Sequence, residues 1–77
     1  MRIVFSPHAE LKITQRKLSR ERIHAAILHP DFRRLGYGGR EQRFKKFGKN
    51  FMKVVVVPEN QALVVVTAHW VARPAKK

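Results

Sequence analysis

Two valine-rich runs near the C-terminus constrain the fold of this chain more than any other feature. Residues 54–57 and 64–66 are all valine, and Pro58-Glu59-Asn60 lies between the runs. β-Branched runs favour strands, and a segment of proline and asparagine favours a tight turn. Because both runs are apolar on both faces, we expect 51–57 and 63–70 to be central strands of a sheet that helices cover on one side.

Two helices are predicted before the sheet. Ser6-Pro7 is a strong helix start, because serine caps the free N–H groups and proline suits the first turn. Ser19 offers a second N-cap, and His29-Pro30 ends the second helix because the residue before proline is pushed out of the α region. The sequence therefore predicts helices over 7–17 and 20–29.

The remaining segments complete an α+β domain. Residues 2–5 form a first β-prone run, 31–35 can form a short strand, and 40–47 alternate loosely between glycine-containing turns. The predicted order is β-α-α-β-β-β, with two N-terminal helices packed on an antiparallel sheet of about four strands. We expect one domain over 1–71 and a basic, disordered tail over 72–77.

The charge balance indicates a polyanionic partner. The sequence has 17 Lys and Arg against five Asp and Glu, a net charge of +12. Such a field attracts phosphate backbones. Solubility alone does not require so one-sided a balance, since acidic residues serve that purpose at least as well. We expect RNA as the partner, alone or on the ribosome, and an acidic protein as the alternative.

Several classes of protein are excluded. The absence of cysteine removes disulfides and thiolate metal sites. No apolar run approaches the roughly 18 residues of a membrane span, and Pro7 interrupts the N-terminus too early for a signal peptide. The five acids are scattered, and His24 and His29 are interpreted as structural, His29 at the negative end of a helix dipole. We expect a cytoplasmic protein without metal, cofactor or membrane partner.

Cations and aromatic residues alternate in the middle of the chain. Between residues 32 and 53, five aromatic residues are interleaved with Lys and Arg, and Glu41 is the only acid in this range. The aromatic residues are Phe32, Tyr37, Phe44, Phe47 and Phe51. Aromatic side chains can stack on bases while cations hold phosphates, although several of these aromatics are needed for the core. The RNA-binding candidates are Lys12, Arg33, Arg34, Arg40, Lys46, Lys49 and Lys53.

Histidine combined with cations can cleave RNA without a metal, by attack of the ribose 2′-OH on the neighbouring phosphorus. Strict alternation places Leu63, Val65, Thr67 and His69 on one face of the last strand. Arg43 and Lys45 share one face of the preceding basic strand. If this face lies on the same side of the sheet as Thr67 and His69, the four residues form a cationic patch. The catalytic candidates are His8, Arg16, Arg43, Lys45, Thr67 and His69, with His8 and His69 as acid and base in either order. Each histidine also has a purely structural interpretation.

A family resemblance covers nearly the whole chain. Ser6-Pro7-His8-Ala9, Arg16 before Leu18-Ser19, His29-Pro30-Asp31 and the final Val64-Val65-Val66-Thr67 resemble a small bacterial domain family of uncharacterised function. That family looks like a branch of the RelE-like toxin superfamily, which shares a fold with barnase-type and colicin-type ribonucleases. The resemblance implies two helices on an antiparallel sheet, and metal-independent RNA cleavage as the ancestral activity.

The resemblance carries over to single residues only in part. His8, Arg16 and Thr67 match recurring positions of the family, and His69 lies where such folds often place a strand-borne catalytic residue. No carboxylate base aligns, and members of the superfamily differ in the residues that perform the chemistry, so the fold does not carry the function by itself.

Three functions are therefore open. The first is a metal-independent endoribonuclease of toxin type, restrained by an acidic antitoxin-like protein. The second is a non-catalytic module that binds RNA or the ribosome. The third is an interaction domain whose basic face holds an acidic protein. The first requires His8 or His69 to lie within reach of Arg16, Arg43 or Lys45.

Overall fold

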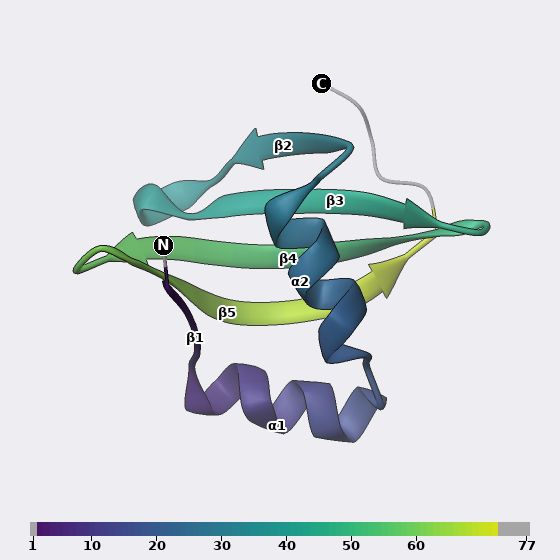
Figure 1. Cartoon of the computed structure of the whole chain (residues 1–77), viewed down its shortest axis with the longest axis horizontal. Helices are drawn as coiled ribbons and strands as arrows, with labels where there is room; N and C mark the ends of the chain where they lie inside the picture. The colour runs from purple at the N-terminus through teal and green to yellow at the C-terminus, as the bar shows by residue number, and fades with distance from the viewer. Residues whose placement is uncertain (1, 73–77) are drawn as a thin grey trace.

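The computed structural model describes residues 2–72, which form two helices and a five-stranded sheet (Figure 1). The elements are β1 (Arg2–Phe5), α1 (Pro7–Arg16), α2 (Arg20–Leu28), β2 (Phe32–Leu35), the short 3₁₀ turn η1 (Tyr37–Gly39), β3 (Glu41–Phe47), β4 (Asn50–Glu59) and β5 (Ala62–Val71). Apart from its first residue, the tail predicted to be disordered lies outside the described residues.

The strand order is β1-β5-β4-β3-β2. Neighbouring strands are antiparallel except for β1, which pairs in parallel with β5. The α+β class with two early helices is confirmed. The sheet has five strands rather than about four, because the short segment 32–35 pairs fully with β3 and forms the edge of the sheet.

Both predicted helix starts are present. The Ser6 hydroxyl accepts a hydrogen bond from the Ala9 N–H at 3.1 Å, and the Ser19 hydroxyl accepts one from the Arg22 N–H at 3.2 Å. Each bond satisfies an N–H group that has no partner inside its helix. No helix within residues 2–72 is long and apolar enough to cross a membrane.

The core lies between the helices and one face of the sheet. In Figure 1, α2 crosses in front of the strands and α1 runs along the β5 side. The buried cluster consists of Ala9, Ile13, Leu18, Ile23, Ala26, Ile27, Met52, Val54, Val56, Leu63, Val65 and Ala68. The opposite face of the sheet carries no helix in the described part of the chain, and we call it the open face.

A β-bulge in β5 decides which side chains reach the open face. Val56 pairs with Val65, but Val55 pairs with Thr67, so Val66 is an extra residue in β5. A bulge of this kind reverses the alternation of side chains along the strand. Leu63 and Val65 therefore face the helices, whereas Thr67 faces the other side. The prediction that Leu63, Val65, Thr67 and His69 share one face is wrong.

Candidate functional site

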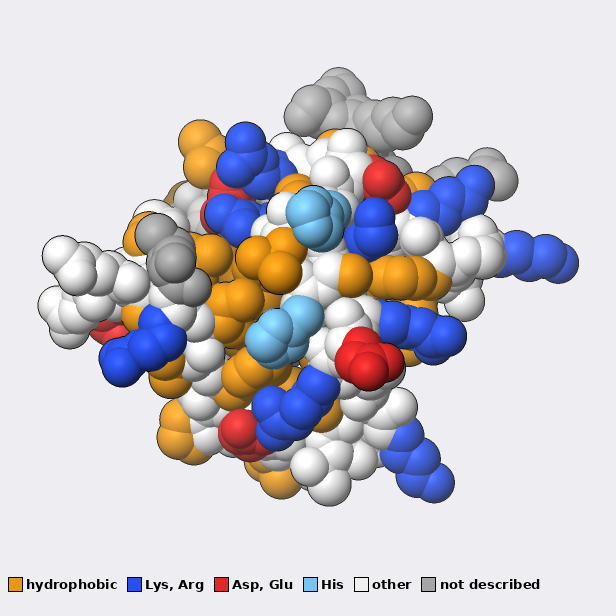
Figure 2. Space-filling view, in the orientation of Figure 1, with side chains coloured by type: hydrophobic (Ala, Val, Ile, Leu, Met, Phe, Trp, Pro, Cys, Tyr) orange, Lys and Arg blue, Asp and Glu red, His pale blue; other side chains and the backbone are white. Residues whose placement is uncertain are grey.

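Three neighbouring rows of side chains on the open face run across β3, β4 and β5, and the first two also include β2. The first row is Arg34, Gln42, Val55 and Thr67; the second is Phe32, Phe44, Lys53 and His69; the third is Lys46, Phe51 and Val71. None of these side chains is acidic. On the helix side, by contrast, Asp and Glu lie among the Lys and Arg side chains (Figure 2). The rows are therefore a cationic and aromatic surface with a single histidine.

Aromatic packing holds the cations of this surface in place. Phe44 is only 1% exposed, and its ring stacks on Phe32 with centroids 4.6 Å apart. The Arg34 guanidinium lies 5.3 Å from the centroid of the Phe44 ring, and the Lys53 ammonium lies 5.9 Å from it. Contacts of this kind attract a cation to the ring face. Phe44 thus anchors two positive charges rather than offering a ring to a base.

His69 lies directly opposite Lys53 on the neighbouring strand. At the outer side of β5, Arg16 from the end of α1 donates a hydrogen bond to the Ala68 carbonyl at 2.8 Å. Burial lowers the pKa of His69 below its usual value, and the positive charges of Lys53 and Arg16 lower it further. His69 is therefore a partly buried imidazole flanked by two cations, and both effects favour its neutral form. A general base reacts in the neutral form.

His8 does not join this group. It is exposed in the first turn of α1, eight residues before Arg16. At 1.5 Å per residue, this spacing places His8 about 12 Å along the helix axis from Arg16, whose side chain reaches β5 beside His69. The structure therefore brings Arg16 and Thr67 close to His69, but not His8.

Arg43 and Lys45 lie on the opposite side of the sheet from His69. Arg43 donates to the Ile27 carbonyl at 2.6 Å and to the Glu41 carboxylate at 2.7 Å, and Lys45 donates to the His29 carbonyl at 3.1 Å. They bind the C-terminal end of α2, whose own last turn has no basic residue. The predicted patch of Arg43, Lys45, Thr67 and His69 is wrong, because the bulge turns Thr67 and His69 to the other face.

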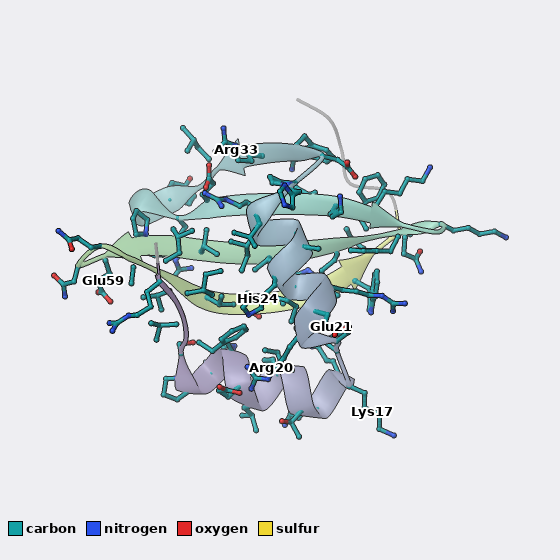
Figure 3. All side chains as sticks on the ribbon, viewed as in Figure 1. Lys17, Arg20, Glu21, His24, Arg33 and Glu59 are labelled. Atoms are coloured by element: carbon teal, nitrogen blue, oxygen red, sulfur yellow. The ribbon has the colours of Figure 1, made fainter. Side chains whose placement is uncertain are left out.

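The predicted RNA-binding residues divide between surfaces. Arg34, Lys46 and Lys53 are on the open face. Lys12 lies on α1, and Arg33 on the helix side of β2, 3.6 Å from Glu41 (Figure 3). Arg40 and Lys49 belong to the turns at either end of β3.

Several further charged and aromatic side chains pack on the helix side. Arg20 pairs with Glu10 between the two helices (Figure 3), and His24 stacks on Phe5. Trp70 packs edge-on against Phe47, and the Arg22 guanidinium lies over both rings. Within residues 2–72, no group of three or more His, Asp or Glu side chains could hold a metal ion.

Sequence reasoning missed Gln42, which shares the first row with Arg34. The Gln42 Oε1 atom and the Arg34 Nη2 atom are both buried without a hydrogen-bond partner among the described residues. An uncharged side chain in a basic strand gives no signal of its own. Only the register that pairs Arg34 with Gln42 could have identified it.

Comparisons with known proteins support the fold. No protein-family model and no curated protein matches the chain. Among solved structures, the 1.1 Å crystal structure of the Brucella abortus ribonuclease toxin BrnT is similar, with a TM-score of 0.73 over 95% of this chain and 99% of that chain. The two sequences are 18% identical, so the likeness concerns the fold. The fold expected from the sequence resemblance, two helices on a largely antiparallel sheet, is thereby confirmed.

Proposed function

We propose that this chain is a metal-independent endoribonuclease of toxin type whose active site is the open face around His69. The observation that carries the proposal is the position of the His69 imidazole, whose pKa is lowered, between Lys53 and Arg16 in a set of three rows that contain no acidic side chain. The likeness in fold to a ribonuclease toxin supports the same class of activity. The cations of these rows, Arg34, Lys46 and Lys53, favour a phosphate-bearing substrate.

In the proposed reaction, His69 accepts the proton of a ribose 2′-OH, and the 2′-oxygen attacks the adjacent phosphorus. Lys53 and Arg16 stabilise the charge that develops on the phosphorane oxygens. The bond to the 5′-oxygen breaks, and this oxygen takes a proton from the Lys53 ammonium. The products are a 2′,3′-cyclic phosphate and a 5′-OH end. Cross-strand neighbours lie about 5 Å apart at their Cβ atoms, so His69 and Lys53 can flank one phosphate.

The position of a residue relative to His69 gives Thr67 a role in the mechanism and excludes His8 from it. The Thr67 side chain lies on the same face, two residues before His69, and its hydroxyl can donate to a phosphate oxygen. His8 has no role in this mechanism, because it lies two helical turns from Arg16. The general base is therefore one histidine, and the proton donor is a lysine.

A second function, an RNA-binding module without catalysis, is favoured by the aromatic anchoring of Arg34 and Lys53, which a binding surface also requires. In either case the net charge of +12 suits an acidic protein that occupies the basic surface and restrains it, as an antitoxin does. We place both functions in the cytoplasm.

Cleavage of end-labelled single-stranded RNA in the presence of EDTA tests the proposal. His69→Ala should lower the cleavage rate about 10²- to 10⁴-fold, the usual worth of a positioned general base. The matched control is His8→Ala, which removes an exposed histidine far from Arg16 and should leave the rate unchanged. RNA with 2′-O-methyl groups should resist, and the products should carry cyclic phosphate ends.

Three outcomes would contradict the mechanism: a need for magnesium, an unchanged rate in His69→Ala, or equal losses in His8→Ala and His69→Ala. If the wild type cleaves no RNA yet binds it with strong salt dependence, the binding function replaces the catalytic one.

A further inference from the structure

Two polar atoms of the open face have no partner among the described residues. Arg34 and Gln42 are directly paired across β2 and β3, and the Arg34 Nη2 donor and the Gln42 Oε1 acceptor are both buried without a hydrogen bond. Burying a polar atom unpaired is unfavourable, and nearly all such atoms in proteins find a partner. A donor and an acceptor on paired residues could bond to each other, but these two do not.

The surroundings of the pair keep it ready for an outside ligand. The Arg34 guanidinium is held by the Phe44 ring, 5.3 Å from its centroid. Each of the two residues is only partly buried as a whole, so both side chains border the solvent although these two atoms do not. A ligand that offers an acceptor beside a donor would satisfy both atoms in one step.

The pair also lies close to the proposed catalytic group. Gln42 pairs with Val55, and Lys53 is two residues from Val55 on the same face of β4. Such diagonal neighbours lie about 7–8 Å apart across an antiparallel pair. A nucleotide whose phosphate rests on Lys53 can therefore place its base against Arg34 and Gln42.

We infer that Arg34 and Gln42 form a base-recognition subsite for a purine, with guanine preferred, next to the phosphate that is cleaved. This inference rests on the proposed function. Guanine presents O6 and N7 acceptors to a guanidinium, the commonest specific contact of arginine with a base, and its N1–H lies beside O6 for the amide oxygen of Gln42. Adenine offers the amide oxygen its N6–H and the guanidinium only N7. Pyrimidines lack the second ring and its N7 acceptor.

Oligouridine substrates with one guanine, adenine or cytosine at successive positions around the cut test the subsite. At one position the wild type should prefer guanine over pyrimidines by about 5- to 150-fold in kcat/KM, the discrimination expected of a bidentate contact. Arg34→Lys keeps the charge but loses the planar fork, and Gln42→Ala removes the acceptor, so each should flatten the preference. Arg33→Lys is the matched control, because Arg33 lies on the other face of the same strand.

A second variant tests whether the two atoms truly lack partners. Gln42→Glu places a carboxylate opposite Arg34, so an internal ion pair should form, raise the Tm and remove the guanine preference together. A lower or unchanged Tm with the preference intact would overturn the inference. Melting by circular dichroism and cleavage of the same oligonucleotides give both readings on one sample.

The outcomes separate the subsite from the proposed activity. Cleavage at equal rates for all bases, or a preference that survives Arg34→Lys and Gln42→Ala, overturns the subsite and leaves the ribonuclease. If no RNA is cleaved, binding of the same oligonucleotides by fluorescence anisotropy decides. A guanine preference that these variants abolish then supports the subsite without the chemistry, and its absence overturns both.

Discussion

Replacing Arg43 distinguishes a structural cation from a catalytic one. The Arg43 side chain is 16% exposed and donates both to the Ile27 carbonyl and to the Glu41 carboxylate. Hydrogen bonds that involve a charged group contribute about 1.5–3 kcal/mol each, and Arg33 still neutralises part of Glu41 in the variant. We expect Arg43→Met to lower the free energy of unfolding by about 2–4 kcal/mol. In a chain of this size this corresponds to a Tm that is lower by about 10–25 °C.

Thermal and urea unfolding followed by circular dichroism measure this loss. Lys45→Met is the control on the same face, because its bond to the His29 carbonyl is exposed, and we expect a loss of about 0.3–1 kcal/mol. Both variants should keep the wild-type cleavage rate per folded molecule. A Tm that does not change in Arg43→Met, or a large specific loss of cleavage in a stable Arg43→Met protein, would refute the structural assignment.

Two further predictions concern His69 and the open face. The pKa of His69 is lowered in the folded chain and is about 6.5 in the unfolded chain, so the unfolded state binds more protons. The free energy of unfolding should therefore fall as the pH drops below about 6.5. Lys53→Met should raise the pKa of His69 in an NMR titration and lessen this fall, whereas a pKa unmoved by the substitution would contradict the assignment. The logarithm of the RNA-binding constant should fall with the logarithm of the salt concentration at a slope of about −2 to −3. Lys46→Glu should make this slope shallower, whereas Lys12→Glu should not. Equal effects of the two substitutions would show that RNA binds to another surface.

Local chemistry in the sequence determines most of the fold. The Ser6 and Ser19 caps act within three residues, and the strand hairpin follows from two valine runs around a turn, so these elements could be predicted without tertiary information. The pairing of β1 with β5 joins the two ends of the chain. Nothing within residues 2–5 indicates a parallel partner strand some 60 residues away, because secondary-structure propensity describes only the local sequence.

The site could be predicted only in part, because face assignments depend on register. A single extra residue, Val66, reverses the side of the sheet to which Thr67 and His69 point, and β-branched residues in a row give no sign of where a bulge will form. Arg16 beside His69 was predictable as a candidate but not as a contact, because its bond runs to a backbone carbonyl. The cation opposite His69 is Lys53, which the sequence indicated only as an RNA-binding residue.

The positive charges behind the net charge of +12 differ in their contacts, and these contacts determine which cations an anionic ligand can bind. Arg43 and Lys45 each donate to a backbone carbonyl at the end of α2, and Arg20 pairs with an acid between the helices. Cations engaged in this way stabilise the chain and are poorly placed to bind phosphates. Arg34, Lys46 and Lys53 remain on the open face, where none of the rows carries an acid that would repel RNA. A partner that restrains the proposed activity therefore has to cover these three cations together with His69 and the neighbouring Arg16. Charge-reversed variants of Arg34, Lys46 and Lys53 should weaken RNA binding and partner binding together.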